Sequence, residues 1–503
     1  MKDIKFLFLY PPEQTWPGFM CKPNGSLAYP YLVGALREIG VESYIYDACC
    51  GNEKDDLENF FYESKHLQSG MLQTGVSDDR ILEIASGFDV VCITSIFSQQ
   101  ETQVLRCAKL IKKHFPEILL ISGGVNARVR KDLFFNAGFD VICTSESEET
   151  IKEIAKLLRI DSKDFSNVGK IYFSNKDGEI VDNTHLGQVL IDLDKLPIPA
   201  WDMLPNERYW KIGRPHGGNI KPGMELKYAS IMTSRGCPFH CSYCHIAHEL
   251  EESISGGIGK FRIKSDDRVL EELLILRDNI GAKQIYIEDD SILGIKHRAK
   301  KLLKRITGLG LDLMDVNGIN MIHLVKKSSK KGWMVPDEEL IELLVEVGFT
   351  DINLPFESGN SRIIKKWCSN KLALDRFDPG VLIKTLKKYN LNITTNYMLG
   401  FPDETKEEIE NTIKFGKKMM SFGLDVSNFF LVMPLPGTPI FDYCINNGHL
   451  PIDFNPDRFQ WTKANLDNIA VGKKELEELR DKAWEKCNTE EFKNVRKSWV
   501  VKN

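Results

Sequence analysis

The sequence lacks any apolar run long enough to cross a membrane, and it carries no excess of positive charge. A membrane-spanning helix needs about 20 consecutive apolar residues, and no stretch of the 503 residues supplies them. The formal net charge of -5 argues against a general nucleic-acid binder, so we expect no nucleic-acid partner. The first ten residues enter a strand-like run and do not resemble a signal peptide. We therefore expect a cytoplasmic protein with no membrane span.

Most of the twelve cysteines lack the spacing of a ligand set. A reducing compartment favours free thiols, so we do not expect disulfides. Nine cysteines are interpreted as buried or surface thiols: Cys21, Cys49, Cys50, Cys92, Cys107, Cys143, Cys368, Cys444 and Cys487.

The other three, Cys237, Cys241 and Cys244, form a C-x3-C-x2-C run directly after an extended apolar segment. Three thiolates so close together can hold three irons of a 4Fe–4S cluster and leave the fourth iron open. S-adenosylmethionine can chelate that iron, and its reductive cleavage would release a deoxyadenosyl radical. Two other interpretations remain open. One is a structural zinc site with His240 or His245 as the fourth ligand, and the other is a set of three buried thiols.

The length and the pattern of apolar residues predict an α/β protein of two or three domains. Five apolar runs of strand length alternate with helical stripes in the first domain, which we place at residues 1–165: 4–9, 41–46, 90–94, 118–122 and 141–143. This alternation predicts a doubly wound parallel sheet, and such sheets bind ligands at the carboxyl ends of their strands. A polar insertion at 51–79 interrupts the pattern and could be a lid or a surface excursion.

Small and polar residues follow the predicted strands of the first domain: Pro11-Pro12, Thr94-Ser95, Gly123-Gly124 and Thr144-Ser145-Glu146. Glycines let a backbone approach a large cofactor closely, and hydroxyls can hydrogen-bond amide side arms. The alternative is that Gly and Ser are simply what loops contain.

A linker with a hairpin around Asp177-Gly178 and a proline-rich connector is expected at residues 166–226. Beyond it, six strand candidates, most of them followed by helical segments, predict a partial (β/α)6 barrel at 227–445: 228–233, 284–287, 312–317, 351–356, 392–398 and 427–433. Reactive residues of such barrels gather at the carboxyl ends of the strands, where the cysteine run also lies. The tail, 446–503, is expected to be helical around 473–486.

Several short motifs accompany the cysteine run, in order, through residues 1–445. In the first half they are Pro11-Pro12, G-G-V-N at 123–126, S-E-S-E-E-T at 145–150 and L-D-K-L-P-I-P-A-W-D at 193–202. In the second half they are E-D-D at 288–290, N-G at 317–318, F-E-S-G at 356–359, G-F-P-D-E-T at 400–405 and P-L-P-G-T-P at 434–439. With these motifs the chain resembles the radical S-adenosylmethionine superfamily, and within it the cobalamin-binding branch.

The resemblance implies a Rossmann-like cobalamin-binding domain followed by a radical S-adenosylmethionine barrel, with a 4Fe–4S cluster, S-adenosylmethionine and cobalamin as cofactors. The implied cluster ligands are Cys237, Cys241 and Cys244. The implied S-adenosylmethionine contacts are Tyr243 beside the adenine, Glu288 and Asp289 near the amino group, Glu357 and Ser358 near the ribose, and Gly400 and Met433 near the adenine. The implied cobalamin contacts are Pro12, Thr94, Ser95, Gly123, Gly124, Val125 and Glu146. For Glu288 and Asp289 helix capping is an alternative, and for Met433 core packing.

Three departures from the family pattern stand out. There is no D-x-H-x-x-G run, so no histidine ligand below the cobalt is identified; many members of this branch lack it as well. Ser145 and Ser147 stand where the branch usually has glycines. Asn320 stands where relatives often have arginine, and the basic insertion at 326–331 that follows is either a solvated loop or a phosphate site.

The activity that the resemblance implies is transfer of a methyl group from methylcobalamin to an unactivated carbon, or a phosphorus atom, after hydrogen abstraction by a deoxyadenosyl radical. The substrate would be a small molecule or peptide, and the electron donor a flavodoxin or ferredoxin. One alternative keeps the cofactors but produces cyclisation, ring contraction or oxidation without methyl transfer. Another is a non-catalytic cobalamin- or zinc-binding protein. Methylthio transfer to nucleic acid is disfavoured, because we find neither a second cysteine triad nor a basic binding domain.

Overall fold

The computed structural model describes residues 2–19, 21–23, 25–215, 226–329, 332–372 and 374–494. Within these residues the chain forms two compact units. The first contains the chain up to Tyr228 together with Glu249–Ile258, and the second contains Ala229–His248 and the chain from Gly259 onward. The stretch shortly after the cysteine run, which we expected in the second domain, therefore contributes to the first unit.

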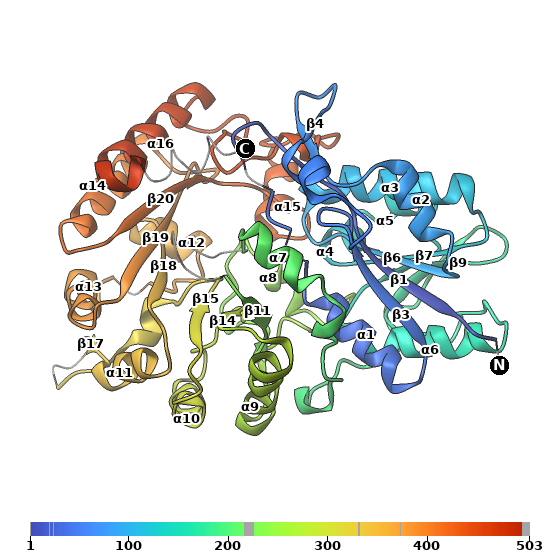
Figure 1. Ribbon diagram of the computed structural model, residues 1–503. Coiled ribbons are helices and arrows are strands. Elements are labelled where there is room, and N and C mark those ends of the chain that lie inside the picture. The colour runs from blue at the N-terminus through green and yellow to red at the C-terminus, as the bar shows by residue number, and fades with distance from the viewer. Residues whose placement is uncertain are drawn as a thin grey trace. The chain divides into compact units, whose positions relative to one another are not determined.

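The first unit is built on a seven-stranded sheet with the order β10-β9-β8-β7-β6-β1-β3 (Figure 1). The strands are β1 (Lys5–Tyr10), β3 (Glu42–Asp47), β6 (Val90–Thr94), β7 (Leu119–Gly123), β8 (Val141–Cys143), β9 (Ile171–Ser174) and β10 (Ile180–Asp182). Five of them, from β3 to β8 in the sheet, are parallel and coincide with the five predicted runs. The predicted doubly wound α/β fold is thus confirmed. Strand order reverses between β1 and β6, where doubly wound sheets bind ligands.

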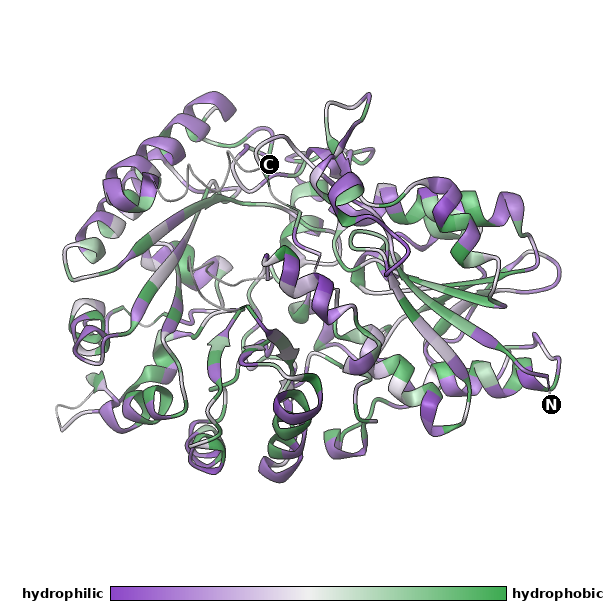
Figure 2. Cartoon of the chain, in the orientation of Figure 1, coloured by the Kyte–Doolittle hydropathy of each residue, from purple (hydrophilic) through white to green (hydrophobic). Residues whose placement is uncertain are grey.

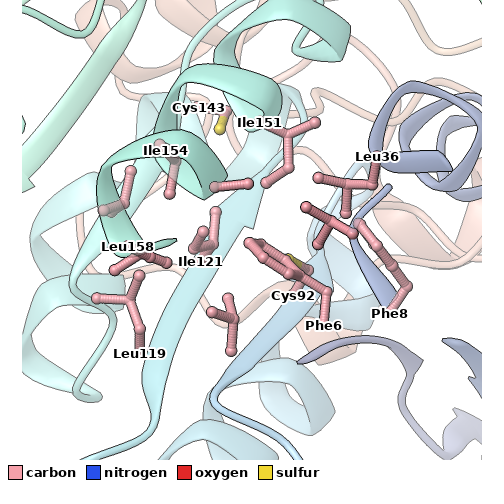
Figure 3. Packing of buried hydrophobic residues seen from close by; sticks show 14 of the residues in the cluster. Phe6, Phe8, Leu36, Cys92, Leu119, Ile121, Cys143, Ile151, Ile154 and Leu158 are labelled. Carbon is pink, nitrogen blue, oxygen red and sulfur yellow. The ribbon is translucent and has the colours of Figure 1, made fainter. Parts of the chain in front are cut away.

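Side chains that alternate along the strands build a core on each face of this sheet. Phe6 and Phe8 of β1 point to one face, which α1 (Ala28–Glu38) and α6 (Glu148–Arg159) cover (Figure 3). Leu7 and Leu9 point to the other face, which is covered by α2 (Asp78–Ala85), α3 (Glu101–His114) and α5 (Lys131–Asn136). The two-residue period of the strand produces this division.

The predicted hairpin forms, and it extends the sheet. Strand β9 pairs with β8 and β10 pairs with β9, both antiparallel, so residues expected in a linker cover the free edge of β8. The proline-rich connector packs on α1, where Ala200 N donates to the carbonyl oxygen of Pro30 at 2.8 Å and Trp201 is fully buried. Residues 216–225 of the expected linker lie outside the described residues.

The insertion at 51–79 is ordered around a small antiparallel sheet. Strand β5 (Leu72–Thr74) pairs with β2 (Glu13–Thr15) on one side and β4 (Lys65–His66) on the other. A π-helix, Glu58–Tyr62, precedes β4. The insertion is thereby attached to the chain that leaves β1.

The second unit contains two parallel three-stranded sheets, β11-β14-β15 and β18-β19-β20. The strands are β11 (Tyr228–Ile231), β14 (Gln284–Ile287), β15 (Asp312–Asp315), β18 (Asp351–Glu357), β19 (Asn392–Leu399) and β20 (Val426–Leu431). A parallel bridge between Leu313 and Phe349 connects the two sheets. The helices that alternate with these strands are α9 (Asp266–Leu274), α10 (Lys296–Ile306), α11 (Glu338–Glu346), α12 (Ser361–Trp367), α13 (Pro379–Lys388) and α14 (Lys406–Met420) (Figure 1). The predicted partial barrel of six strands is confirmed.

The tail packs on the last strand of the barrel through α16 (Lys473–Cys487), which coincides with the predicted helix. Arg480 Nε donates to the carbonyl oxygen of Phe429 at 2.9 Å. Asn488 bonds both the N–H and the carbonyl oxygen of Ser427 and so covers the edge of β20. In both units hydrophobic residues concentrate on the strands and the hydrophilic ones on the outer helices (Figure 2). Among the described helices, none has the length and apolar character that crossing a membrane requires.

Tyr29 of α1 closes the space between β1 and β6 beyond their last paired residues, Phe8 and Cys92. Its hydroxyl lies 2.9 Å from the carbonyl oxygen of Leu9 and 3.2 Å from that of Cys92, and it accepts a hydrogen bond from Thr94 N at 2.7 Å. The hydroxyl therefore satisfies backbone groups that the diverging strands leave unpaired.

Replacing this hydroxyl should destabilise the first unit. Tyr29→Phe leaves buried backbone groups without a partner, and we expect it to lower the free energy of unfolding by about 1–3 kcal/mol. Tyr44→Phe removes a hydroxyl from an exposed tyrosine that bonds Glu42, and it should change stability little. Urea unfolding of the two variants measures the difference, and equal losses would contradict this role of Tyr29.

Candidate functional site

The three cysteines of the motif lie in the loop after β11. Cys241 is buried, while Cys237 and Cys244 are partly exposed. Gly236 precedes them with a φ of +77°, and a Cβ there would lie 2.5 Å from the carbonyl oxygens of Gly259 and Lys260. Cys237 N donates to the same Gly259 oxygen at 3.1 Å. Only glycine allows this close approach, so the motif needs Gly236 as well as its cysteines.

The start of the loop is held by Asp289, which follows β14. This fully buried carboxylate accepts hydrogen bonds from Thr233 N and Thr233 Oγ1 at 2.6 Å each and from Ser234 Oγ at 2.5 Å. The guanidinium of Arg298 donates to Thr233 Oγ1 and to the Thr233 carbonyl oxygen. The described bonds of Asp289 position the loop, and the ligand contact expected for this residue stays a prediction.

The far side of the loop is bonded to the chain after α12 and to α15 (Pro439–Asn446). Ser242 N donates to the carbonyl oxygen of Trp367 at 2.8 Å, and Ile440 N donates to that of Ser242 at 2.8 Å. Ser369 Oγ lies 3.2 Å from both His240 N and His240 Nδ1. The loop is thus attached on both sides by groups other than the thiols.

The three thiols are not gathered around one point in the structure. Ligand atoms of a mononuclear site lie within about 4 Å of one another, as zinc–ligand bonds of 2.0–2.3 Å require. In the described chain the thiols of Cys237, Cys241 and Cys244 do not all lie within 4.8 Å of each other. A polynuclear cluster, which spreads its ligands over several metal atoms, agrees with this spacing better than a zinc ion does.

Nearby charges shift the pKa values of the three thiols in opposite directions. Burial raises the pKa of Cys237 to about 11 and raises that of Cys244, and the carboxylate of Asp290 adds to both shifts. Burial also raises the pKa of Cys241, but the ammonium of Lys371 opposes this shift. The thiols are therefore protonated in the metal-free protein, and metal binding must displace their protons.

A buried hydrogen-bonded triad lies beside Cys241. Glu357 Oε1 accepts from Tyr243 Oη at 2.8 Å and from Lys371 Nζ at 2.7 Å. The Lys371 and Glu357 side chains are 10% and 7% exposed, so the ion pair is shielded from solvent. Glu357 ends β18 with a φ of +64°, a conformation that costs a non-glycine residue of the order of 1–3 kcal/mol. The predicted residues Tyr243 and Glu357 are thus brought together with Cys241.

Acidic groups lie at the carboxyl ends of β14 and β15, and the amide of Asn353, the third residue of β18, lies next to Gly318 in the loop after β15. Burial raises the pKa of Glu288 to about 7 and that of Asp315 to about 8. Asp315 Oδ1 accepts from Gly318 N at 2.6 Å, while Asp315 Oδ2 and Asn353 Oδ1 are buried without a hydrogen-bond partner among the described residues. Unsatisfied buried acceptors of this kind are suited to a ligand that donates hydrogen bonds.

Two residues predicted to contact S-adenosylmethionine have internal neighbours in the structure, and a third is buried. Ser358 is fully buried and lies 3.0 Å from Thr412 Oγ1. Gly400 has a φ of +83°, and a Cβ there would lie 2.6 Å from Leu476 of α16. Met433 is buried. The ligand contacts expected for these residues remain predictions, since core packing accounts for each of them as well.

In the first unit, the residues predicted to hold a large cofactor lie at the carboxyl ends of β1, β6, β7 and β8. Thr94, Gly123, Gly124 and Glu146 are partly exposed there, whereas Ser95, Val125 and Pro12 are buried. Gly124 has a φ of +96°, and a Cβ on it would lie 2.5 Å from the carbonyl oxygen of Ser95. Ser95 and Val125 therefore pack inside the protein at this edge of the sheet, whereas the partly exposed residues can contact a ligand.

The stretch Glu249–Ile258 covers the end of β8 within the first unit. Ser145 Oγ donates to the carbonyl oxygen of Ser255 at 2.7 Å. The Arg128 side chain forms a buried ion pair with Glu249 at 2.6 Å. Part of the Ser145–Glu146 edge is thus occupied by the protein itself.

Sequence reasoning missed Asp315, Asn353 and Lys371, and it quoted Asp290 only as part of the E-D-D motif. Asp315 had a usable signal, because it ends β15 and polar residues at the carboxyl ends of barrel strands are candidate ligands. Asn353 had no such signal, since it is the third residue of β18. Lys371 had none, since it lies in an irregular segment and meets Glu357 only in the folded protein.

The basic insertion gives no support for a phosphate site in its described part. It forms a hairpin of β16 (Val325–Lys327) and β17 (Met334–Pro336). Asp337 lies 3.0 Å from Lys300 and 3.9 Å from Lys326, so it neutralises the nearby positive charge. Lys330 and Lys331 lie outside the described residues.

Comparison with known sequences and structures agrees with this geometry. Residues 231–416 match the radical SAM superfamily. An uncharacterized methyltransferase of Pyrococcus horikoshii is 31% identical over 373 residues, which cover 72% of this chain and 70% of that protein. Cytidylyl-2-hydroxyethylphosphonate methyltransferase of Streptomyces wedmorensis is 25% identical over 474 residues, which cover 88% of this chain and 82% of that protein.

Among solved structures, the fold is similar to that of the radical S-adenosylmethionine methyltransferase TsrM from Kitasatospora setae with cobalamin and a [4Fe-4S] cluster bound. The TM-score is 0.62 at 16% identity, and the match covers 89% of this chain and 78% of that one. The arrangement of a doubly wound sheet followed by a partial barrel is therefore shared.

The triad beside Cys241 can be tested by its energetic coupling. Lys371→Met and Glu357→Gln each leave a buried group unpaired, and each should lower the free energy of unfolding by about 3–5 kcal/mol. The double variant should lose clearly less than the sum of the two. The exposed pair Arg37 and Asp202 is the control and should show no such coupling. Additive losses at Lys371 and Glu357 in urea unfolding would contradict the triad.

Proposed function

Because the chain belongs to the radical S-adenosylmethionine superfamily, in its cobalamin-binding branch, we propose that it is a methyltransferase acting on an unactivated carbon or phosphorus atom of a small-molecule or peptide substrate. Methyltransferases are among the relatives that match most of this chain, which supports methyl transfer from methylcobalamin. The observation that carries the proposal is the cysteine loop at the mouth of a six-stranded barrel, with methyltransferase relatives along most of the chain.

The residues present fit the family's cluster. Cys237, Cys241 and Cys244 would hold it, since all three lie in one loop after the first barrel strand, with the Cys241 thiol beside Lys371. When bound, the cluster and S-adenosylmethionine supply a radical that removes a hydrogen atom from the substrate, and cobalamin supplies the methyl group. Lys371 places a positive charge beside Cys241, which offsets part of the negative charge that the thiolates add.

For S-adenosylmethionine, we propose that Glu288 accepts a hydrogen bond from the amino group and that Tyr243 lies beside the adenine. The unpartnered oxygens of Asp315 and Asn353 support a ligand with hydrogen-bond donors near the end of β15. Glu357 holds the Tyr243 hydroxyl and so orients the ring. Asp289 acts through the loop and is a positioning residue.

For cobalamin, we propose the edge of the sheet at Thr94, Gly123, Gly124 and Glu146. The reversal of strand order between β1 and β6 supports this placement, since such sheets bind cofactors there. Gly124 lets the backbone pass within contact of Ser95 and leaves this edge without bulky side chains.

The electron donor and the compartment are part of the same proposal. A radical S-adenosylmethionine enzyme needs a one-electron donor, and we propose a flavodoxin or ferredoxin. The free thiols described throughout the chain suit a reducing compartment, the cytoplasm.

The proposal predicts two different fates for S-adenosylmethionine in one reaction. With trideuteromethyl-labelled S-adenosylmethionine, the anaerobic, cofactor-loaded chain should yield S-adenosylhomocysteine, deoxyadenosine and a product that carries the label, as mass spectrometry can detect. Cys244→Ala should abolish deoxyadenosine formation, whereas Cys487→Ala, which removes a buried thiol of α16, should not. The first compound to assay is the substrate named for the Streptomyces relative, followed by small-molecule extracts.

Two outcomes would contradict the proposal, and each would favour a different function. Deoxyadenosine with an unlabelled, rearranged or oxidised product would favour cyclisation, ring contraction or oxidation. Bound zinc without any cleavage of S-adenosylmethionine would favour a non-catalytic binding protein.

The raised pKa of Glu288, about 7, predicts pH-dependent binding. The ionised carboxylate is the stronger hydrogen-bond acceptor. The ionised fraction of Glu288 rises about tenfold between pH 6 and 8, so the association constant for S-adenosylmethionine should rise by up to about tenfold over this range. Glu288→Gln should remove this rise, while the titration of the ligand's own amino group affects both proteins equally. Dissociation constants of the cluster-loaded proteins measure it, and parallel pH profiles would exclude the role of Glu288.

A further inference from the structure

A second group of potential metal ligands lies in the first unit, away from the cysteine run in the chain. Glu13, Cys21 and Cys49 each offer one ligand atom, and these atoms all lie within 4.8 Å of one another. Cys21 and Cys49 are only 5% and 4% exposed. Sequence analysis interpreted both cysteines as isolated thiols, because 28 positions separate them and no motif links them.

Three segments of chain converge at this group. Glu13 begins β2 just after β1, Cys49 lies two residues beyond β3, and Cys21 lies in the loop after β2. Glu13 pairs with Thr74 of β5 in the small antiparallel sheet, and the Cys49 thiol lies 3.7 Å from the carbonyl oxygen of Thr74. The group is therefore where the loop and the insertion meet the carboxyl end of the main sheet.

A further buried acid lies beside the three ligand atoms. The carboxyl of Asp47, also buried, adds a further acidic group, and it accepts hydrogen bonds from Tyr209 Oη and Cys49 N at 2.8 Å each. Lys22 contributes its backbone N–H to Glu13 at 3.3 Å. A divalent cation would offset two of the three negative charges that two thiolates and a carboxylate carry once they have lost their protons.

The donor set points to a particular class of metal. Two thiolates and one carboxylate are ligands that zinc binds in tetrahedral sites, whereas calcium and magnesium prefer oxygen alone. Zinc–ligand bonds of about 2.0–2.3 Å hold ligand atoms about 3.3–3.8 Å apart, so atoms already within 4.8 Å need only small movements.

We propose that Glu13, Cys21 and Cys49 bind a zinc-class divalent cation that ties the loop after β2 to the end of β3. Each thiol releases its proton to solvent as its sulfur bonds the cation, and no oxidation or reduction takes place. Water completes the coordination. The site stabilises the fold of the first unit and does not depend on the proposed methyl transfer.

The experiment uses the full chain with Cys237, Cys241 and Cys244 replaced by alanine, so that the other thiol set cannot contribute. Titration with Co²⁺ should give thiolate-to-cobalt absorption that saturates at one ion per chain and is abolished by excess Zn²⁺. Adding Cys21→Ala or Cys49→Ala should remove this absorption. Cys143→Ala, which removes an equally buried thiol of β8, should leave it unchanged.

A second measurement keeps the test decisive if one of the cysteine variants folds poorly. Zn²⁺ should raise the unfolding temperature of the triple-alanine chain, and Glu13→Gln should weaken Zn²⁺ binding at least tenfold. The proposal fails if the cobalt absorption persists in both Cys21→Ala and Cys49→Ala. It also fails if the two thiols are found joined as a disulfide that binds no metal.

Discussion

The buried carboxylate of Asp289 is the interaction on which the candidate site depends. The cysteine loop has little regular structure of its own, so its start must be fixed by bonds to other elements. Asp289 supplies three of them, to Thr233 and Ser234, and Arg298 binds the same segment. Burial raises the pKa of Asp289, and the donated hydrogen bonds oppose that shift. The described hydrogen bonds of this carboxylate therefore go to the loop, whereas the neighbouring Asp290 lies close enough to Cys237 and Cys244 to raise the pKa of both thiols.

Backbone groups at the open edges of the strands are satisfied differently in the two units. In the first unit, the hydroxyl of Tyr29 bonds the backbone where β1 and β6 diverge, and the hairpin β9–β10 pairs with the edge strand β8. In the second unit, the tail covers the last strand through Asn488 and α16. The carboxyl ends of the strands remain as the places where each unit can receive a ligand, as is usual for parallel sheets flanked by helices.

Much of the fold could be predicted because the signals are local. Apolar runs of strand length marked the five parallel strands and the six barrel strands, and the cysteine spacing is contained in eight residues. The features that the sequence did not predict depend on contacts between distant segments. The sequence of residues 288–290 does not tell which carboxylate turns into the loop, and nothing near Lys371 indicates that it meets Glu357. The hairpin at 171–182 was predicted, but the strand with which it pairs was not, because the sequence of an edge strand does not specify its pairing partner.

One chain carries two cofactor-binding units in our proposal, one for a cluster and one for a corrinoid. The most direct measurement is the ultraviolet–visible spectrum of protein purified without oxygen from cobalamin-fed cells, taken after gel filtration. We expect the broad charge-transfer absorption of an iron–sulfur cluster together with corrin bands that stay with the protein. Cluster absorption without corrin bands would contradict the assignment of the first unit, and methyl transfer from cobalamin would then have to be abandoned.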